Sequence, residues 1–327
     1  ERRRPYGSSA FRTLIPLGRS PLRMLIDRYL DHLAYEKRCS VHTVAAYKRD
    51  LAQFRAFLER NGAGPIEQAT DRTIRTWMMG LMEEGQSARS VNRKLSALRG
   101  FYRFARVTGS VAVEPSALVD APRMPKRLPE FVEEQRMDRL FNTQAWPKGY
   151  LGDLHRLMME LLYGTGMRLA ELLGLKVADV SLRTGTLKVL GKRNKERIIP
   201  IGPQLVARIA DHLRTREQVV GPFSPSDALL VDEQAKPMAR RSVQRLVVHY
   251  LSGVTSQQKR SPHVLRHTFA THMLEHGADL NAVKELLGHA GLAATQVYTH
   301  NTVEKLRKVH ANAHPRGGGQ GINNEHP

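Results

Sequence analysis

A proline-dense segment divides this sequence into two parts and limits how each can fold. Four prolines fall between residues 111 and 129, at positions 115, 122, 125 and 129. Proline fixes φ and has no N–H to donate, so this density opposes a helix and favours an extended connection. A chain of 327 residues is also long enough for roughly two domains. We therefore predict a basic flexible tail over 1–20, a first domain over 21–109, a linker over 110–129, a second domain over 130–313 and a disordered tail over 314–327.

The charge balance narrows the class of partner. Lysine and arginine number 51 against 31 acidic residues, a formal net charge of +20. Such a surface attracts polyanions and releases counterions from nucleic acid, so any affinity for DNA or RNA should fall steeply with salt. Ribosomal RNA and anionic membrane surfaces fit this charge equally well, and charge alone does not separate them.

Cysteine content and hydropathy indicate the compartment. Cys39 is the single cysteine, which excludes an intramolecular disulfide and favours a reducing environment. No apolar run approaches the ~20 residues that a bilayer-spanning helix needs, and the first residues lack the apolar core of a secretory signal. We expect a cytoplasmic, nucleoid-associated protein with no membrane partner.

Hydrophobic periodicity predicts four amphipathic helices in the first domain, at about 22–37, 41–61, 70–85 and 88–107. In the fourth, arginines share an arc of about 140° when residues are placed about 100° apart. Such an arc is often only a solvated face, but this one contains no acid and has small residues between the cations. We predict phosphate contacts from its members, Arg89, Arg93, Arg99, Arg103 and Arg106.

Three short stretches of the second domain carry candidate chemistry. Arg168 and Glu171 lie in TGMRLAELLGL, after a helical pattern that ends in glycine. His263 and Arg266 lie three apart at the start of another helical pattern, so both side chains can converge on one ligand. His289 follows a short helix at about 280–287, and Tyr298 follows a run of small residues. Each group alone has an ordinary structural interpretation, and we expect His272 and His276 to be plain helix surface.

The order and spacing of these groups resemble the C-terminal signature of tyrosine recombinases, especially the Xer branch. HVLRH, LLGH and the tyrosine of QVYTH occur here in that family's order, and TGMRLAELLGL resembles its first box. A β-hairpin is predicted from strands at about 186–190 and 197–201, and its GKRNKERIIP sequence resembles the hairpin that carries the family's catalytic lysine. The resemblance extends over about residues 21–315.

The resemblance implies a mainly α fold with a small antiparallel β-sheet, in which a helical core-binding domain precedes the catalytic domain. It also implies that a tyrosine attacks a DNA phosphodiester, forming a 3′-phosphotyrosyl intermediate, and that strands are exchanged through a Holliday junction. No metal or cofactor is required. The implied catalytic residues are Arg168, Lys192, His263, Arg266, His289 and Tyr298, with Glu171 supporting them.

The expected partner is double-stranded DNA at a specific recombination site. A helix at about 240–251 should add contacts through Arg240, Arg241 and Arg245. The resemblance implies a tetramer, of one protein or of two paralogues, in which each C-terminal helix docks into a neighbouring protomer and which an additional protein can activate. Resolution of chromosome or plasmid dimers is the leading function. Integration of a mobile element, relaxation of DNA by a type IB topoisomerase and DNA binding without catalysis are the alternatives.

Overall fold

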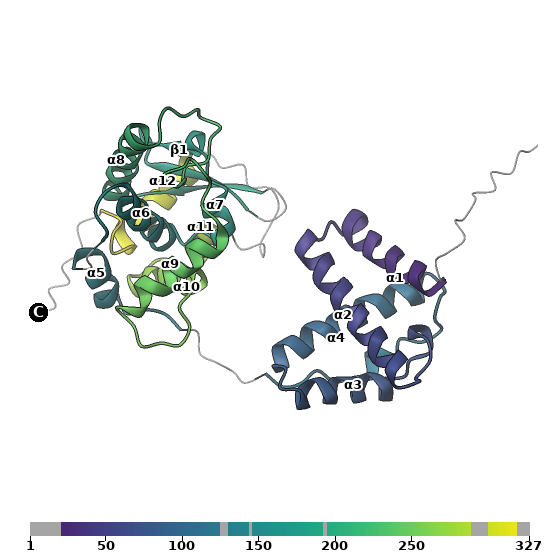
Figure 1. The fold of residues 1–327 in the computed structure, drawn as a ribbon. Coiled ribbons are helices and arrows are strands. Elements are labelled where there is room, and N and C mark those ends of the chain that lie inside the picture. The colour runs from purple at the N-terminus through teal and green to yellow at the C-terminus, as the bar shows by residue number, and fades with distance from the viewer. Residues whose placement is uncertain (1–20, 125–129, 144–145, 192–194, 289–299, 319–327) are drawn as a thin grey trace, which may run out of the picture. The chain divides into compact units, whose positions relative to one another are not determined.

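A computed structural model describes the fold in five ranges, residues 21–124, 130–143, 146–191, 195–288 and 300–318. The chain separates into two compact units, divided between Arg127 and Leu128 (Figure 1), and each unit is described by itself. Helices dominate both, and the only sheet among the described residues has three antiparallel strands. The predicted fold class is therefore confirmed. No helix in these ranges combines the length and the apolar character needed to cross a membrane.

The N-terminal unit contains the four predicted helices, and their apolar faces meet in one core. Side-chain oxygens of Ser40, Thr70 and Ser87 accept hydrogen bonds from the first turns of the last three helices, which explains where these begin. Fully buried aromatic and aliphatic side chains such as Phe54 and Phe101 fill the core. The helices are α1 (Pro21–Asp31, continued by a π-helical turn at His32–Glu36), α2 (Val41–Arg60), α3 (Asp71–Glu83) and α4 (Ala88–Val107).

The start of the predicted linker is part of this unit. Residues Pro115–Leu118 form a 3-10 turn, and Val119 is buried in the core of the N-terminal helices. Arg99 holds this turn, because its guanidinium donates to the carbonyls of Ser116 at 3.4 Å and Val119 at 2.7 Å. The prediction of an extended linker is therefore wrong for these residues: the prolines prevent an α-helix, but an arginine side chain supplies the missing donors.

The C-terminal unit builds its helices around a small sheet of order β1-β2-β3, in which Leu187 of β2 is paired with Ile199 of β3. Both side chains are buried, so one face of the sheet belongs to the core. The elements are α5 (Glu134–Asn142), α6 (Tyr150–Thr165), α7 (Leu169–Leu173), β1 (Val180–Ser181), β2 (Thr186–Leu190), β3 (Glu196–Pro200), α8 (Pro203–Val219), α9 (Arg240–Ser252), α10 (Pro262–Glu275), α11 (Leu280–Leu287) and α12 (His300–Ala313).

Helix α6 is the central helix of this unit and packs against α8, α9 and α10. It ends at Gly166, which has a left-handed backbone with φ +60°. A Cβ atom at this position would lie 2.5 Å from Cδ1 of Phe269 and 2.8 Å from Cδ2 of Leu287. Only glycine satisfies both the backbone and the packing. The turn it makes directs the chain into Arg168 and α7.

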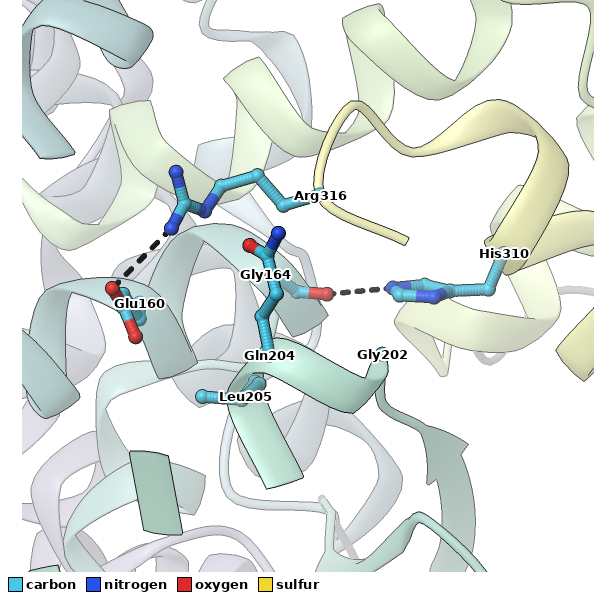
Figure 2. A pocket seen from close by; sticks show the side chains of 7 residues that line it. All are labelled: Glu160, Gly164, Gly202, Gln204, Leu205, His310 and Arg316. Carbon is cyan, nitrogen blue, oxygen red and sulfur yellow. Dashed lines mark hydrogen bonds and ion pairs between the residues drawn. The ribbon is translucent and has the colours of Figure 1, made fainter. Parts of the chain in front are cut away.

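The C-terminal helix α12 packs against its own unit. His310 donates through Nε2 to the carbonyl of Gly164 at 2.8 Å, beside a small cavity that Arg316 also lines (Figure 2). The guanidinium of Arg316 lies over the ring of Phe141 and pairs with Glu160 at 3.4 Å. His314 is buried as well. The prediction of a disordered tail from residue 314 is therefore wrong for residues 314–318, because His314 is buried and Arg316 pairs with Glu160 inside the unit.

Candidate active site

Arg168 and Glu171 form the first part of the site, at the start of α7. The Glu171 carboxylate accepts a hydrogen bond from the backbone N–H of Arg168 at 2.7 Å, which caps the helix. Its Oε1 also accepts from Nη1 of Arg168 at 2.8 Å. One carboxylate therefore fixes both the backbone and the side chain of Arg168. That side chain remains 33% exposed, so part of it reaches solvent.

Arg197 of β3 is a partner of Glu171 that the sequence prediction missed. Its Nη1 and Nη2 donate to the two carboxylate oxygens of Glu171 at 2.8 and 3.0 Å. Burial alone would raise the pKa of the Glu171 carboxyl, but the hydrogen bonds and charge of Arg197, together with Arg168, lower it to about 2. Glu171 is therefore ionised at neutral pH. A signal was present in the sequence, since the two-residue period of a strand places Arg197 on the same face as Ile199.

Helix α10 supplies Arg266 and His263. Arg266 is 8% exposed and donates to the carbonyls of Gly166 at 2.7 Å and Leu287 at 2.6 Å. Burial, together with the nearby charges of Arg168 and Arg197, lowers the pKa of the Arg266 guanidinium to about 10, so it keeps its charge at neutral pH. His263 lies one turn earlier on the same helix and is exposed.

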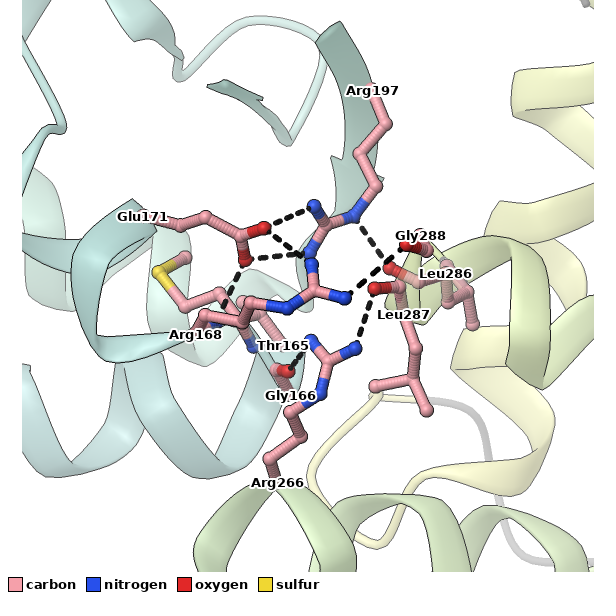
Figure 3. Close-up of polar contacts among 10 residues, drawn as sticks. Thr165, Gly166, Arg168, Glu171, Arg197, Arg266, Leu286, Leu287 and Gly288 are labelled. Carbon is pink, nitrogen blue, oxygen red and sulfur yellow. Dashed lines mark hydrogen bonds and ion pairs between the residues drawn. The ribbon is translucent and has the colours of Figure 1, made fainter. Parts of the chain in front are cut away.

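The three arginines meet at the C-terminal end of α11 (Figure 3). Three consecutive carbonyls each accept from a different arginine: Leu286 from Nε of Arg197 at 2.8 Å, Leu287 from Nη2 of Arg266 at 2.6 Å, and Gly288 from Nη2 of Arg168 at 3.3 Å. The last carbonyls of a helix have no partner within the helix and carry partial negative charge. They therefore fix the guanidinium groups of three separate elements, β3, α10 and the start of α7, around one point.

This arginine cluster, Arg168, Arg197 and Arg266 with Glu171, has more positive than negative charge. Three guanidinium groups face one carboxylate, a balance of two positive charges (3 − 1). Each guanidinium has five N–H groups, and the contacts described above engage two nitrogens of Arg168 and two of Arg266. The N–H groups left over, with the surplus charge, suit an anion with several oxygens such as a phosphodiester.

The structure thus brings together three of the predicted site residues, Arg168, Glu171 and Arg266. His263 is on the same helix as Arg266, with its side chain at the surface. Lys192, His289 and Tyr298 lie outside the described residues. Gly191, which precedes Lys192, is next to Glu171, since a Cβ built on it would be 3.6 Å from Oε1 of that residue. Among the described residues, no group of three or more His, Cys, Asp or Glu side chains could hold a metal ion.

The arginine arc of α4 is not uniform. Arg89 and Arg103 are exposed, and Arg93 and Arg106 are also exposed while paired with Asp50 and with Glu114, respectively. Arg99 differs, because its guanidinium is half-buried and bound to the backbone of 116–119. We therefore assign Arg99 to folding. On α9 of the other unit, Arg240, Arg241 and Arg245 are all exposed.

His272 does not lie on the surface of its helix as expected. It is fully buried, and a 2.9 Å hydrogen bond joins its Nδ1 to the hydroxyl of Tyr163. The prediction failed because α10 packs against both α6 and α12. A helix covered on two sides has no single apolar stripe that sequence periodicity can identify.

Comparisons with known proteins identify the family. The model described as the phage integrase family matches residues 130–305, and the phage integrase N-terminal SAM-like domain matches residues 26–109. The tyrosine recombinase XerD of Pseudomonas aeruginosa is 40% identical over 294 residues, which cover 90% of this chain and 98% of that protein. The chain belongs to the phage integrase family of tyrosine recombinases. The predicted family is confirmed.

Two further proteins are similar to this tyrosine recombinase. XerC of Pelobacter propionicus is 39% identical over 298 residues, covering 90% of this chain and 97% of the relative. A solved structure of a lambda integrase tetramer bound to a Holliday junction matches 84% of this chain and 80% of its own, with 21% identity and a TM-score of 0.61. That structure shows a shared fold.

Proposed function

We propose that this recombinase cleaves and rejoins double-stranded DNA at a specific site, and that its arginine cluster holds the scissile phosphate. The observation that carries the proposal is the cluster's surplus of two positive charges, with Arg168 reaching the surface. Phosphoryl transfer builds negative charge on the equatorial oxygens, and fixed donors in a partly desolvated site stabilise that charge. Arg168 and Arg266 supply such donors.

The remaining roles follow from the family resemblance. Tyr298 is the nucleophile: its oxygen forms a bond to phosphorus while the bond from phosphorus to the 5′ oxygen breaks. A phenol of ordinary pKa about 10 needs a base at neutral pH, and His263 is the group assigned to take its proton. Lys192 donates a proton to the departing 5′ oxygen, and His289 donates a hydrogen bond to a non-bridging oxygen. The products are a 3′-phosphotyrosyl enzyme and a free 5′ hydroxyl, and the reverse reaction rejoins a strand without an added energy source.

Exposed arginines on both units extend the proposed DNA contact. Because phosphate contacts position a protein on DNA without reading its sequence, these cations set affinity and its salt dependence. All of these arginines are exposed, and they lie on a single helix in each unit. The proposed set is Arg89, Arg93, Arg103 and Arg106 on α4, and Arg240, Arg241 and Arg245 on α9.

The biological role proposed here is that of the Xer branch, the resolution of chromosome or plasmid dimers in the cytoplasm. It is supported by the two relatives, named XerD and XerC, which match over nearly their whole length. Assembly follows the tetramer seen for lambda integrase on a Holliday junction. In the proposed assembly α12 leaves its own unit and docks into a neighbouring protomer, with self or paralogue as the neighbour and a separate protein as activator.

Covalent trapping tests the chemistry. The full-length recombinase is incubated with sheared genomic DNA of its source, and DNA bound covalently to protein is recovered and sequenced to give the site. A nicked duplex carrying this site loses a short 5′ fragment on cleavage, which prevents rejoining and traps the phosphotyrosyl complex. We expect a protease-sensitive complex that is absent in Tyr298→Phe. A salt-sensitive mobility shift without any covalent complex would instead show a DNA-binding protein without catalysis.

The arginines are tested on the same nicked duplex. Arg168→Ala and Arg266→Ala should each lower the single-turnover cleavage rate by at least about 10²-fold, the usual effect of removing one donor to a transition-state oxyanion. Binding of the site should change by only a few fold, because many other cations contact the DNA. Arg214→Ala removes an exposed arginine of α8 that pairs with Asp211 and serves as the control. Cleavage at the normal rate in either variant would remove that arginine from the proposed site.

A further inference from the structure

We propose that Arg197 is a positioning residue for DNA cleavage, acting through Arg168 without touching the DNA. This inference rests on the proposed role of Arg168 at the scissile phosphate. Arg197 is only 4% exposed, whereas Arg168 is 33% exposed. The two side chains share one atom, Oε1 of Glu171, to which each donates from Nη1 at 2.8 Å. Arg197 can therefore set the position of Arg168, although Arg197 itself is too buried to contact the DNA.

Arg197 joins two elements that Arg168 needs in fixed positions. Its two terminal nitrogens hold the carboxylate of Glu171, and its Nε holds the carbonyl of Leu286 at the end of α11. Arg168 binds the same carboxylate and, two residues further along the same helix end, the carbonyl of Gly288. Both anchors of the Arg168 guanidinium are thus set by Arg197. Without Arg197, the carboxylate and the helix end lose their common tie, and Arg168 loses its fixed orientation.

The contacts require the planar fork of an arginine. The side chain donates in three directions at once, to two oxygens of one carboxylate and to a backbone carbonyl of a different element. A lysine carries its positive charge on a single nitrogen and cannot reproduce this fixed geometry. Gly288 leaves room for the arginine, because a Cβ atom there would lie 3.1 Å from Cδ and from Nη1 of Arg197.

The test compares Arg197→Met and Arg197→Lys with matched changes at Arg216. Arg216 is a second buried arginine of the same unit, also 4% exposed, and donates to the carbonyls of Ala228 and Leu229. Arg216→Met and Arg216→Lys therefore report what the loss of a buried arginine does to folding alone. For each variant, thermal unfolding, affinity for the uncleaved site and the single-turnover cleavage rate on the nicked duplex are measured.

A charge-neutral substrate separates positioning from a general loss of structure. The same nicked duplex is prepared with a methylphosphonate at the scissile linkage, which removes the negative charge that Arg168 would neutralise. On the natural linkage, Arg197→Met should cleave about 10²-fold more slowly than wild type, as loss of a charge-stabilising donor would. On the methylphosphonate, the gap should shrink by at least about tenfold, because positioning of Arg168 no longer matters.

Arg197→Lys should remain at least about tenfold slower than wild type on the natural linkage, and both Arg216 variants should stay within about threefold on both linkages. A lysine variant as fast as wild type would show that charge without the fork suffices, and would overturn the proposal. A gap of equal size on the two linkages would also overturn it, since a merely structural defect slows both. If wild-type protein forms no covalent complex at all, the proposed function fails first.

Discussion

Replacing Glu171 by glutamine removes the carboxylate that the arginine cluster shares while keeping its shape. The amide keeps one acceptor oxygen, but it presents an NH₂ donor in place of the other oxygen and has no charge, so Arg168 and Arg197 lose one acceptor and the negative charge they share. The pKa of Glu171 falls from an ordinary 4.5 to about 2, a difference of about 2.5 units. At 1.36 kcal/mol per unit, this corresponds to about 3 kcal/mol of stability from the ionised carboxylate. The side chain is only 3% exposed, so solvent screening is small.

The pH dependence follows from the direction of this shift. A carboxylate with a lowered pKa in the folded state contributes fully above the unfolded value, and its contribution is lost as pH falls through about 4.5 toward 2. Urea unfolding should therefore show Glu171→Gln about 3 kcal/mol less stable than wild type at pH 7, with the difference narrowing below pH 4.5. Cleavage of the nicked duplex should fall as well, because Arg168 loses its orientation.

Glu196→Gln is the matched control for this experiment. Glu196 lies next to Arg197 on the same strand, but its side chain is 60% exposed and its partner Lys188 is 3.7 Å away. Such a surface pair is worth well under about 1 kcal/mol. If Glu171→Gln cost no more than Glu196→Gln, or if its cost did not change between pH 7 and pH 3, the ionised carboxylate would not be what holds the cluster together.

Three further perturbations probe other parts of the chain. Gly288→Ala should lower the free energy of unfolding in urea by about 2 kcal/mol and slow cleavage, because φ is +65° and the new Cβ would press on Arg197. The control is Gly277→Ala, where φ is +78° but the surrounding space is open. It should cost about 1 kcal/mol and leave cleavage intact. Burial holds the pKa of His314 well below its ordinary value, so folding stability should fall as pH drops below about 6.5. His314→Leu should flatten this dependence when the free energy of unfolding is measured from pH 8 to pH 5. An unchanged slope would contradict this explanation. Arg103→Gln should weaken DNA binding and reduce the slope of log affinity against log salt by about 1, without changing stability. Arg99→Gln should instead destabilise the N-terminal unit by about 1–2 kcal/mol. A loss of stability in Arg103→Gln, with weaker DNA binding alone in Arg99→Gln, would contradict both assignments.

Helices with one apolar face were well predicted from the sequence. The ranges expected at 88–107 and 280–287 match α4 and α11, because each has a clear start or stop residue and one solvated side. Prediction was weaker at 114–119, where partners distant in sequence supply the hydrogen bonds. The two arginines that differ most, Arg99 and Arg103, occupy the same arc of α4, but Arg99 binds the backbone of the 3-10 turn whereas Arg103 is exposed.

The candidate site was predictable where its residues are close in sequence. Arg168 and Glu171 are three residues apart, and the structure brings them together. His263 and Arg266 have the same spacing, but the structure describes His263 only as exposed, and its role stays a prediction. Arg197 was missed because its partners are 26 and 89 positions away in the chain. The two-residue period of β3 places Arg197 on the same face as Ile199, but this pattern does not identify the carboxylate that Arg197 binds. His272 was misassigned for a similar reason, since its partner Tyr163 is 109 residues away.

The docked position of α12 in its own unit affects how a ring of recombinases would have to form. His310 and Arg316 already occupy partners there, so a helix that passes to a neighbour must first vacate this position. In the proposed ring, each position that α12 leaves would be filled by α12 of the adjacent molecule, which could form the same hydrogen bonds and ion pairs there. The exchange of helices would then change the free energy little. In a lone molecule, however, its own α12 is always present at high effective concentration, which favours the unexchanged state. Protomers bound side by side on one DNA molecule would also present their α12 helices to each other at high effective concentration. DNA binding would therefore control when the ring closes.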